Sequence, residues 1–155
     1  GLVIAGLTEP EAGEMCREAG EGKEVELRVG GKLDPINGYP LQIRGRVERV
    51  IPGRLAVVRI GGVQLVLLSE RRPMVDLRSF EEAGIDPRES KAVVVKVGLL
   101  FSDARRLAEK AIMALTPGFT SLELEKLPYK RLRRPIYPLD GDFEWEPRFE
   151  DEVRR

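Results

Sequence analysis

The residues best suited to chemistry in this chain include a lysine placed directly after a glycine turn. Gly30, Gly31 and Lys32 follow an alternating strand pattern and precede Asp34. Successive backbone N–H groups in a glycine turn can cradle an anion, and an adjacent lysine adds positive charge to the same contact. The segment lacks the glycine spacing and the Ser or Thr after lysine that define a P-loop. It therefore indicates either a phosphate or carboxylate site or a turn that simply ends a strand.

Lys96 is a second candidate because it stands near the end of a β-branched run, residues 91–97. An ammonium group beside a buried strand costs free energy unless it is paired or reaches a cleft. Ligands of α/β sheets bind beyond the carboxyl ends of strands, where this lysine would lie. The alternative is that its stem packs while its amine snorkels or pairs with a carboxylate. The candidate ligand-binding residues are thus Gly30, Gly31, Lys32, Asp34 and Lys96.

The residue types that are missing exclude much catalytic chemistry. The 155 residues contain no histidine and one cysteine. The chain can therefore form no imidazole base, no Ser-His or Cys-His pair and no histidine metal ligand. Ser69 and Ser90 lack a recognisable activating base, and the carboxylates show no spacing typical of metal ligands. We predict no catalytic residue, no metal ligand and no cofactor within this chain.

Charge and cysteine content restrict the partners and the setting. The 26 basic residues balance 26 acidic ones, which argues against a dedicated nucleic-acid binder. Residues 126–135 are locally basic and either contact phosphates or pair with the acidic tail that follows. Cys16 has no disulfide partner in the chain, which favours a reducing, cytoplasmic setting. The sequence shows no secretory segment and no 18-residue apolar run, so we predict no membrane partner. Its scarcity of side-chain amides is typical of thermophilic proteins.

The hydrophobic pattern predicts an α/β fold in which a mixed sheet positions these residues. Alternation and turn signals favour a half-exposed strand over 25–29, a longer one over 41–50, and a hairpin around Gly61-Gly62. This makes the middle section antiparallel. Capping signals predict helices over 11–19 and 76–83, and an Ala-rich helix over 104–115 that completes a strand-turn-helix unit. The run at 91–97 is expected to be buried on both faces, and the C-terminal tail to be irregular.

Six motifs, taken in order along the chain, resemble the C-terminal domain of the MlrC family, which is named for the microcystin-degradation protein. The match covers almost the whole chain, and its strength comes from the order and spacing of the motifs. The motifs are Gly-Gly-Lys-x-Asp-Pro at 30–35, Gly-Arg-Val at 45–47, Arg-x-Gly-Gly-Val at 59–63, Gly-Ile-Asp-Pro-Arg at 84–88, Val-Val-Val-Lys at 93–96 and Leu-Pro-Tyr-Lys-Arg-Leu-Arg-Arg-Pro-Ile-Tyr-Pro-Leu-Asp at 127–140.

The resemblance implies an accessory domain of a zinc-dependent peptidase or amidohydrolase. The zinc ligands would lie in a separate N-terminal domain, which would be the partner of residues 1–140, with 141–155 forming an acidic tail. The apolar run that starts directly at Gly1 is consistent with a fragment of such a longer protein. The family pattern has a histidine where this chain has Leu100. The alternative hypothesis is a non-catalytic binding or assembly module, and a homo-oligomer is compatible with either.

Overall fold

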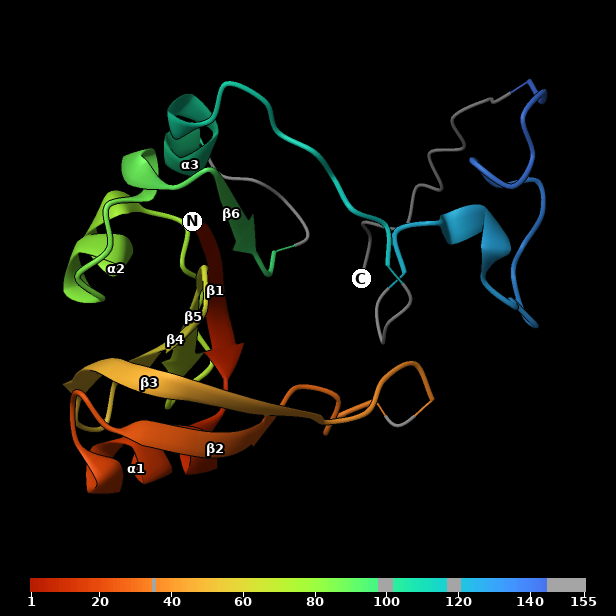
Figure 1. Cartoon of the computed structure of the whole chain (residues 1–155). Coiled ribbons are helices and arrows are strands. Elements are labelled where there is room, and N and C mark those ends of the chain that lie inside the picture. The colour runs from red at the N-terminus through yellow and green to blue at the C-terminus, as the bar shows by residue number, and fades with distance from the viewer. Residues whose placement is uncertain (35, 98–101, 117–120, 145–155) are drawn as a thin grey trace, which may run out of the picture. The chain divides into compact units, whose positions relative to one another are not determined.

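The computed structural model describes residues 1–34, 36–97, 102–116 and 121–144, and the side chains of 102–104 are left aside. The chain divides into two compact units, Gly1–Ala114 and Leu115–Arg155. We call them the sheet unit and the C-terminal unit and describe each by itself (Figure 1).

The sheet unit is built on one six-stranded mixed sheet with the order β2-β3-β4-β5-β1-β6. The strands β2 to β5 are joined in antiparallel fashion, whereas β1 lies between β5 and β6 and runs parallel to both. This confirms the predicted mixed sheet with an antiparallel middle section. The strands are β1 (Leu2–Thr8), β2 (Glu24–Val29), β3 (Leu41–Ile51), β4 (Leu55–Ile60), β5 (Val63–Leu68) and β6 (Ala92–Val95).

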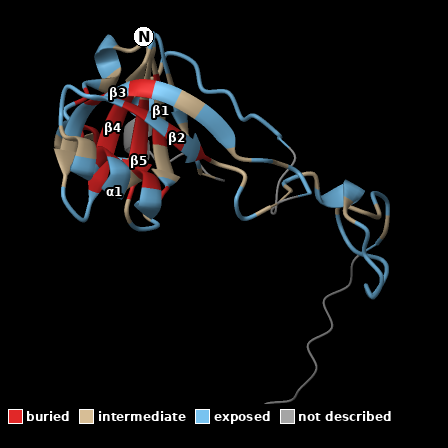
Figure 2. Ribbon diagram, turned by 60° about the horizontal axis from the view of Figure 1, so that its bottom comes forward, coloured by how far each residue is buried: buried red, intermediate tan, exposed pale blue. Residues whose placement is uncertain are grey.

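Two hydrophobic cores lie on opposite faces of this sheet. The helix α1 (Pro10–Ala19) contributes Ala12 and Cys16 to one core, and α2 (Leu77–Glu82) contributes Phe80 to the other. Strand β4 serves both cores because successive side chains of a strand point to opposite faces. Its residues Leu55 and Val57 belong to the α2 core, while its other buried residues belong to the α1 core. The buried residues consequently concentrate in the central strands (Figure 2).

Local sequence signals account for both helices that cover the sheet. Pro10 occupies the first position of α1, where its missing N–H and fixed φ favour a helix start. Asp76 caps α2, and its side chain accepts a hydrogen bond from the Ser79 backbone N at 2.8 Å. The hairpin at Gly61-Gly62 joins β4 to β5 as predicted.

The run that we expected to be buried on both faces is instead an edge strand. Within the described residues, β6 pairs with β1 alone. Val93 and Val95 pack against the α2 core, whereas Ala92 and Val94 are exposed. The β-branched composition was therefore a correct signal for a strand. The burial inferred from it is wrong, because among the described residues β6 has one strand neighbour and Ala92 and Val94 stay exposed.

The predicted helix over 104–115 is shorter than its alanine content indicated. The structure has α3 (Ser102–Leu107), and the residues from 108 to 116 are not helical. Ile112, Met113 and Leu115 are all exposed. A short helix gains most of its stability from packing an apolar face. Without such burial, propensity alone does not extend α3.

The described part of the C-terminal unit is irregular, as predicted for the tail. Its regular elements there amount to one short 3₁₀ helix, η2 (Leu124–Lys126), and the sheet unit has another, η1 (Pro87–Glu89). Arg134 and Asp140 form an ion pair, and the Asp140 carboxylate also accepts a hydrogen bond from the Ile136 backbone N at 2.7 Å. None of the described residues from 121 to 144 is buried.

Candidate functional site

Glu9 anchors the glycine turn to the sheet unit. It lies between β1 and α1, and only 4% of it is exposed. Its side chain does not cap α1. Instead, one carboxylate oxygen accepts a hydrogen bond from the Gly30 backbone N at 2.6 Å, and the other lies 2.6 Å from Lys32 Nζ. The end of β1 is thereby tied to the end of β2 across 21 positions of sequence.

The glycine turn and Lys32 contact one of the protein's own carboxylates. A backbone N–H from the glycine turn and the adjacent lysine both bind Glu9, which is the arrangement that the sequence predicted for a bound phosphate or carboxylate. Lys32 also lies 3.6 Å from a Glu11 carboxylate oxygen. The hydrogen bond to Glu9 raises the pKa of Lys32 above its usual value. Lys32 is therefore a charged group between two carboxylates, and an external anion would have to compete with them.

Two glycines allow this turn to close. Gly30 and Gly31 have positive φ values of 71° and 61°, a conformation that costs free energy in residues with a side chain. A Cβ atom at Gly31 would lie 2.2 Å from the Tyr39 carbonyl carbon. The two ends of the β2–β3 connection therefore touch through backbone atoms, and only glycine fits at this contact.

Asp34 organises the same connection. Its Oδ1 accepts hydrogen bonds from the Ile36 and Asn37 backbone N atoms, both at 3.2 Å, and its Oδ2 accepts one from Asn37 Nδ2 at 2.8 Å. The hydrogen bond from the Asn37 side chain lowers the pKa of Asp34 below its usual value. Its carboxylate thus acts within the connection, as Asp commonly does in turns.

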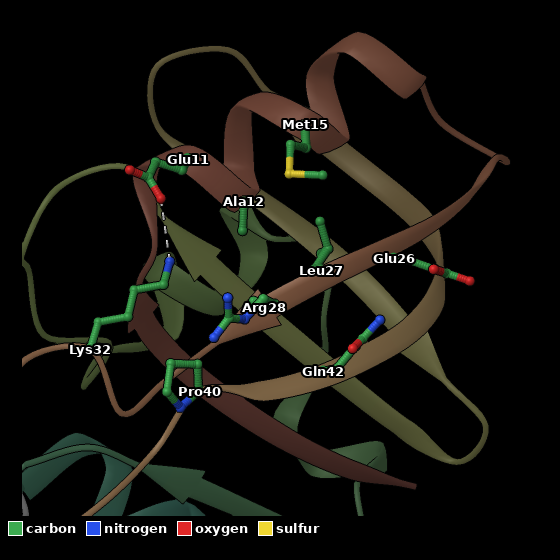
Figure 3. A pocket seen from close by; sticks show the side chains of 9 residues that line it. All are labelled: Glu11, Ala12, Met15, Glu26, Leu27, Arg28, Lys32, Pro40 and Gln42. Atoms are coloured by element: carbon green, nitrogen blue, oxygen red, sulfur yellow. Dashed lines mark ion pairs between the residues drawn. The ribbon is translucent and has the colours of Figure 1, made fainter. Parts of the chain in front are cut away.

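A hollow of about 500 Å³ lies between α1 and the edge strand β2. Four charged residues border it: Glu11 and Lys32, whose ion pair is drawn in Figure 3, together with Glu26 and Arg28. Apolar side chains and one amide complete the lining: Ala12, Met15, Leu27, Pro40 and Gln42. A ligand with an apolar body and a charged group would match this mixture of surfaces.

The fifth candidate, Lys96, is separated from the other four. It follows β6 and is exposed. The connection that carries Lys32 leaves β2, and β2 and β6 form the two opposite edges of the sheet. The structure thus brings Gly30, Gly31 and Lys32 together with Asp34 in one turn, and Lys96 lies elsewhere. Leu100, at the position of the family's histidine, lies outside the described residues.

Sequence reasoning missed two carboxylates that the fold surrounds with partners. Glu9 was one, and its only signal was that glutamate is a poor N-cap residue at a helix start. The other is Glu48, where β3 is irregular in its pairing with β4. Burial opposes ionisation of Glu48, but hydrogen bonds from Arg59 and Gln64 outweigh it and lower its pKa. These three residues help to line a hollow of about 310 Å³.

The side chains that the structure describes do not form a metal centre. The sequence has no histidine, and residues 1–34, 36–97, 102–116 and 121–144 hold no group of three or more histidine, cysteine or acidic side chains arranged to bind an ion. Cys16 is free and buried. Within the same described ranges, no helix is long and apolar enough to cross a membrane.

The fold is similar to that of a longer solved protein. A “Putative metallopeptidase” from Mesorhizobium sp. BNC1 superposes with a TM-score of 0.72 and 24% sequence identity. The similarity covers 93% of this chain but 32% of that one. At this identity the comparison establishes the fold alone.

Sequence comparison identifies the family. The family model described as “MlrC C-terminus” matches residues 1–131, and the chain therefore belongs to the MlrC family as its C-terminal region. The chain is 27% identical over 106 residues to Microcystinase C from Sphingomonas sp.. This alignment covers 60% of the present chain and 21% of the relative, so the chain corresponds to about a fifth of that protein's length.

Proposed function

We propose that this chain is the accessory C-terminal domain of an MlrC-like metal-dependent hydrolase that cleaves peptide or amide bonds. Zinc and its ligands would belong to an N-terminal domain of the same protein. The observation that carries this proposal is the family match over residues 1–131. The relatives extend well beyond the region that they share with this chain, which supports a catalytic domain elsewhere in the longer protein. Residues 1–140 would then act as the domain and 141–155 as its acidic tail.

The proposed task of the glycine turn is to present Lys32 at a cleft shared with that N-terminal domain. Glu9 fixes the position of Lys32 Nζ, and an ammonium group carries three protons. A proton directed away from Glu9 can orient an anionic group of the substrate or of the neighbouring domain. Gly30, Gly31 and Asp34 maintain the turn, and Lys96 would line the same cleft only if the N-terminal domain spans both edges of the sheet.

Hydrolysis assays test the division of labour. The longer protein and the 155-residue chain are compared for zinc-dependent cleavage of peptides and amides. We expect turnover only from the longer protein, because the described residues of this chain form no metal centre and the zinc ligands are expected in the N-terminal domain. Zinc-dependent turnover by the 155-residue chain alone would show that the proposal is wrong.

Substitution of the lysines tests the shared cleft. Lys32→Met in the longer protein should lower turnover, while Lys23→Met, a change at an exposed lysine near the other end of β2, should not. Lys96→Met applies the same test to the second candidate. Circular dichroism establishes that each variant is folded, and unchanged kinetics of a folded Lys32 variant would assign that residue a purely structural role.

A non-enzymatic binding or assembly module is the second candidate function. The C-terminal unit favours it, because Leu122, Tyr129 and Tyr137 are exposed there, and such side chains are common at interfaces. The module could assemble as a homo-oligomer in a reducing, cytoplasmic setting. The genomic reading frame upstream of Gly1 separates the two functions: a metal-binding domain encoded there supports the hydrolase, and a start codon close to Gly1 supports the module.

A further inference from the structure

The β2–β3 connection carries an unusual concentration of exposed apolar side chains. Ile36, Leu33 and Tyr39 are 91%, 87% and 82% exposed, and they are the three most exposed large hydrophobic residues of the described part of the chain. Single exposed apolar residues are normal on protein surfaces. Several of them in one short segment indicate a surface that another molecule covers.

These side chains are displayed by an organised turn. Asp34 accepts hydrogen bonds from the backbone of Ile36 and Asn37, and its own carbonyl accepts one from the Gly38 N at 3.1 Å. The close approach of Gly31 to the Tyr39 backbone closes the turn at its base. Because these hydrogen bonds and this close approach already restrain the described residues of the connection, covering their side chains would cost less conformational entropy than folding a loose segment on contact.

The charged groups of the same connection are satisfied internally. Lys32 pairs with Glu9 and Glu11, and the Asp34 carboxylate accepts three N–H donors. A partner that covered the apolar side chains would therefore not leave a charge buried without a counter-charge. An unpaired buried charge is the main penalty for burying ionic groups at an interface. The connection is thus suited to an apolar contact.

We propose that Leu33, Ile36 and Tyr39 are the docking surface for the N-terminal metal-binding domain of the longer protein. This inference rests on the proposed function. The occupant follows from chain length: the shared region is 32% of the solved relative, and a domain in the same chain meets this surface at a high effective concentration. Docking there would also place that domain beside the hollow that Lys32 and Pro40 line.

Thiol labelling of Ile36→Cys tests the docking surface. Cys16 gives little background because it is fully buried and its pKa is raised to about 11 by that burial. The variant is made in the longer protein and in the 155-residue chain, and maleimide labelling of the peptide containing residue 36 is followed by mass spectrometry. We expect labelling to be at least about tenfold slower in the longer protein, which corresponds to about 1.4 kcal/mol of protection. Glu81→Cys on α2, an exposed site on the other side of the sheet, serves as the control and should label equally fast in both.

Each outcome decides the proposal. Slower labelling of residue 36 in the longer protein at every protein concentration supports it. Equal rates in the two proteins overturn it, and so does protection that grows with protein concentration, because the occupant would then be a second copy of the chain. Zinc-dependent hydrolysis measured on the same samples separates the two proposals. Activity without protection would overturn only the proposed docking surface, and protection without activity would overturn only the proposed hydrolase function.

Discussion

The two units of this protein rely on different sources of order. In the sheet unit, both faces of β4 and β5 are buried, and two separate cores flank the same strands. In the described part of the C-terminal unit, no residue between 121 and 144 is buried, and the hydrogen bonds and ion pairs there, such as Arg134–Asp140, are local in sequence. Burial of apolar surface is the dominant favourable term in folding, whereas exposed ion pairs contribute little. The sheet unit should thus hold nearly all of the chain's own stability.

This contrast bears on function, because exposed apolar residues are found in two places that have no hydrophobic core of their own. The C-terminal unit exposes several, including Leu132 and Tyr137, and the β2–β3 connection of the sheet unit exposes three more. The two places differ in how their backbone is held. Hydrogen bonds to Glu9 and Asp34 restrain Gly30 and Ile36 of the connection, while the C-terminal unit has no comparable buried anchor within its described residues.

Truncation of one core side chain should produce the largest effect. Leu67 is fully buried in the α1 core, and Leu67→Ala removes apolar contacts and leaves a cavity. We expect a loss of about 2–5 kcal/mol in the free energy of unfolding, measured by urea denaturation. Leu132→Ala in the C-terminal unit is the matched control and should change stability by less than about 0.5 kcal/mol. A comparable loss in both variants would mean that the two units share their stability.

Substitution of the buried anchor should be the next largest effect. Glu9→Gln keeps an acceptor for Gly30 but removes the charge that pairs with Lys32. Because Lys32 is partly exposed and can regain water, we expect a moderate loss of roughly 1–3 kcal/mol, again by urea denaturation. Glu14→Gln breaks an exposed pair with Arg17 and should leave the midpoint unchanged. An unaltered midpoint for Glu9→Gln would show that the anchor does not stabilise the sheet unit.

Alternation and turn residues were sufficient to predict most of the sheet, because they report local geometry. The pattern around Gly61-Gly62 predicted the hairpin, and the signals at Pro10 and Asp76 predicted two helix starts. Burial could not be predicted in the same way, since it depends on which elements lie next to one another. The run ending at Val95 has the composition of a central strand, yet it lies at an edge.

The candidate site shows the same limit. From the sequence, the glycine turn and Lys32 were either an anion site or a turn that ends a strand, and the carboxylate that Lys32 contacts stands 23 positions away at Glu9. Such a pairing depends on how β1 and β2 end in space, and no local pattern encodes it. The same argument applies to Glu48, whose partners Arg59 and Gln64 reach it only through the pairing of β3, β4 and β5.

Raising the pH should weaken the sheet unit through Cys16. Burial raises the pKa of this thiol from 9.0 to about 11, so the folded state keeps its proton where the unfolded chain has lost it. The part of the free energy of unfolding that depends on the Cys16 proton is therefore fully present below pH 9.0. It falls by roughly 1–2 kcal/mol as the pH rises toward 11. Urea denaturation between pH 8 and pH 11 measures this fall. Cys16→Ala should remove this part of the pH dependence, and an identical fall in that variant would assign it to other groups.

The smallest global effect is expected for the ion pair of the C-terminal unit. Asp140→Asn weakens the pair with Arg134 but preserves an oxygen that can accept from the Ile136 N–H. The urea midpoint, which reports the sheet unit, should not change. The local effect should appear on acidification, because the hydrogen bond from Arg134 lowers the pKa of Asp140 below its usual value. In the parent chain the Ile136 amide resonance should move as Asp140 becomes protonated at low pH, and in Asp140→Asn this transition should be absent. A shift of the urea midpoint in this variant would contradict the assignment of nearly all of the chain's stability to the sheet unit.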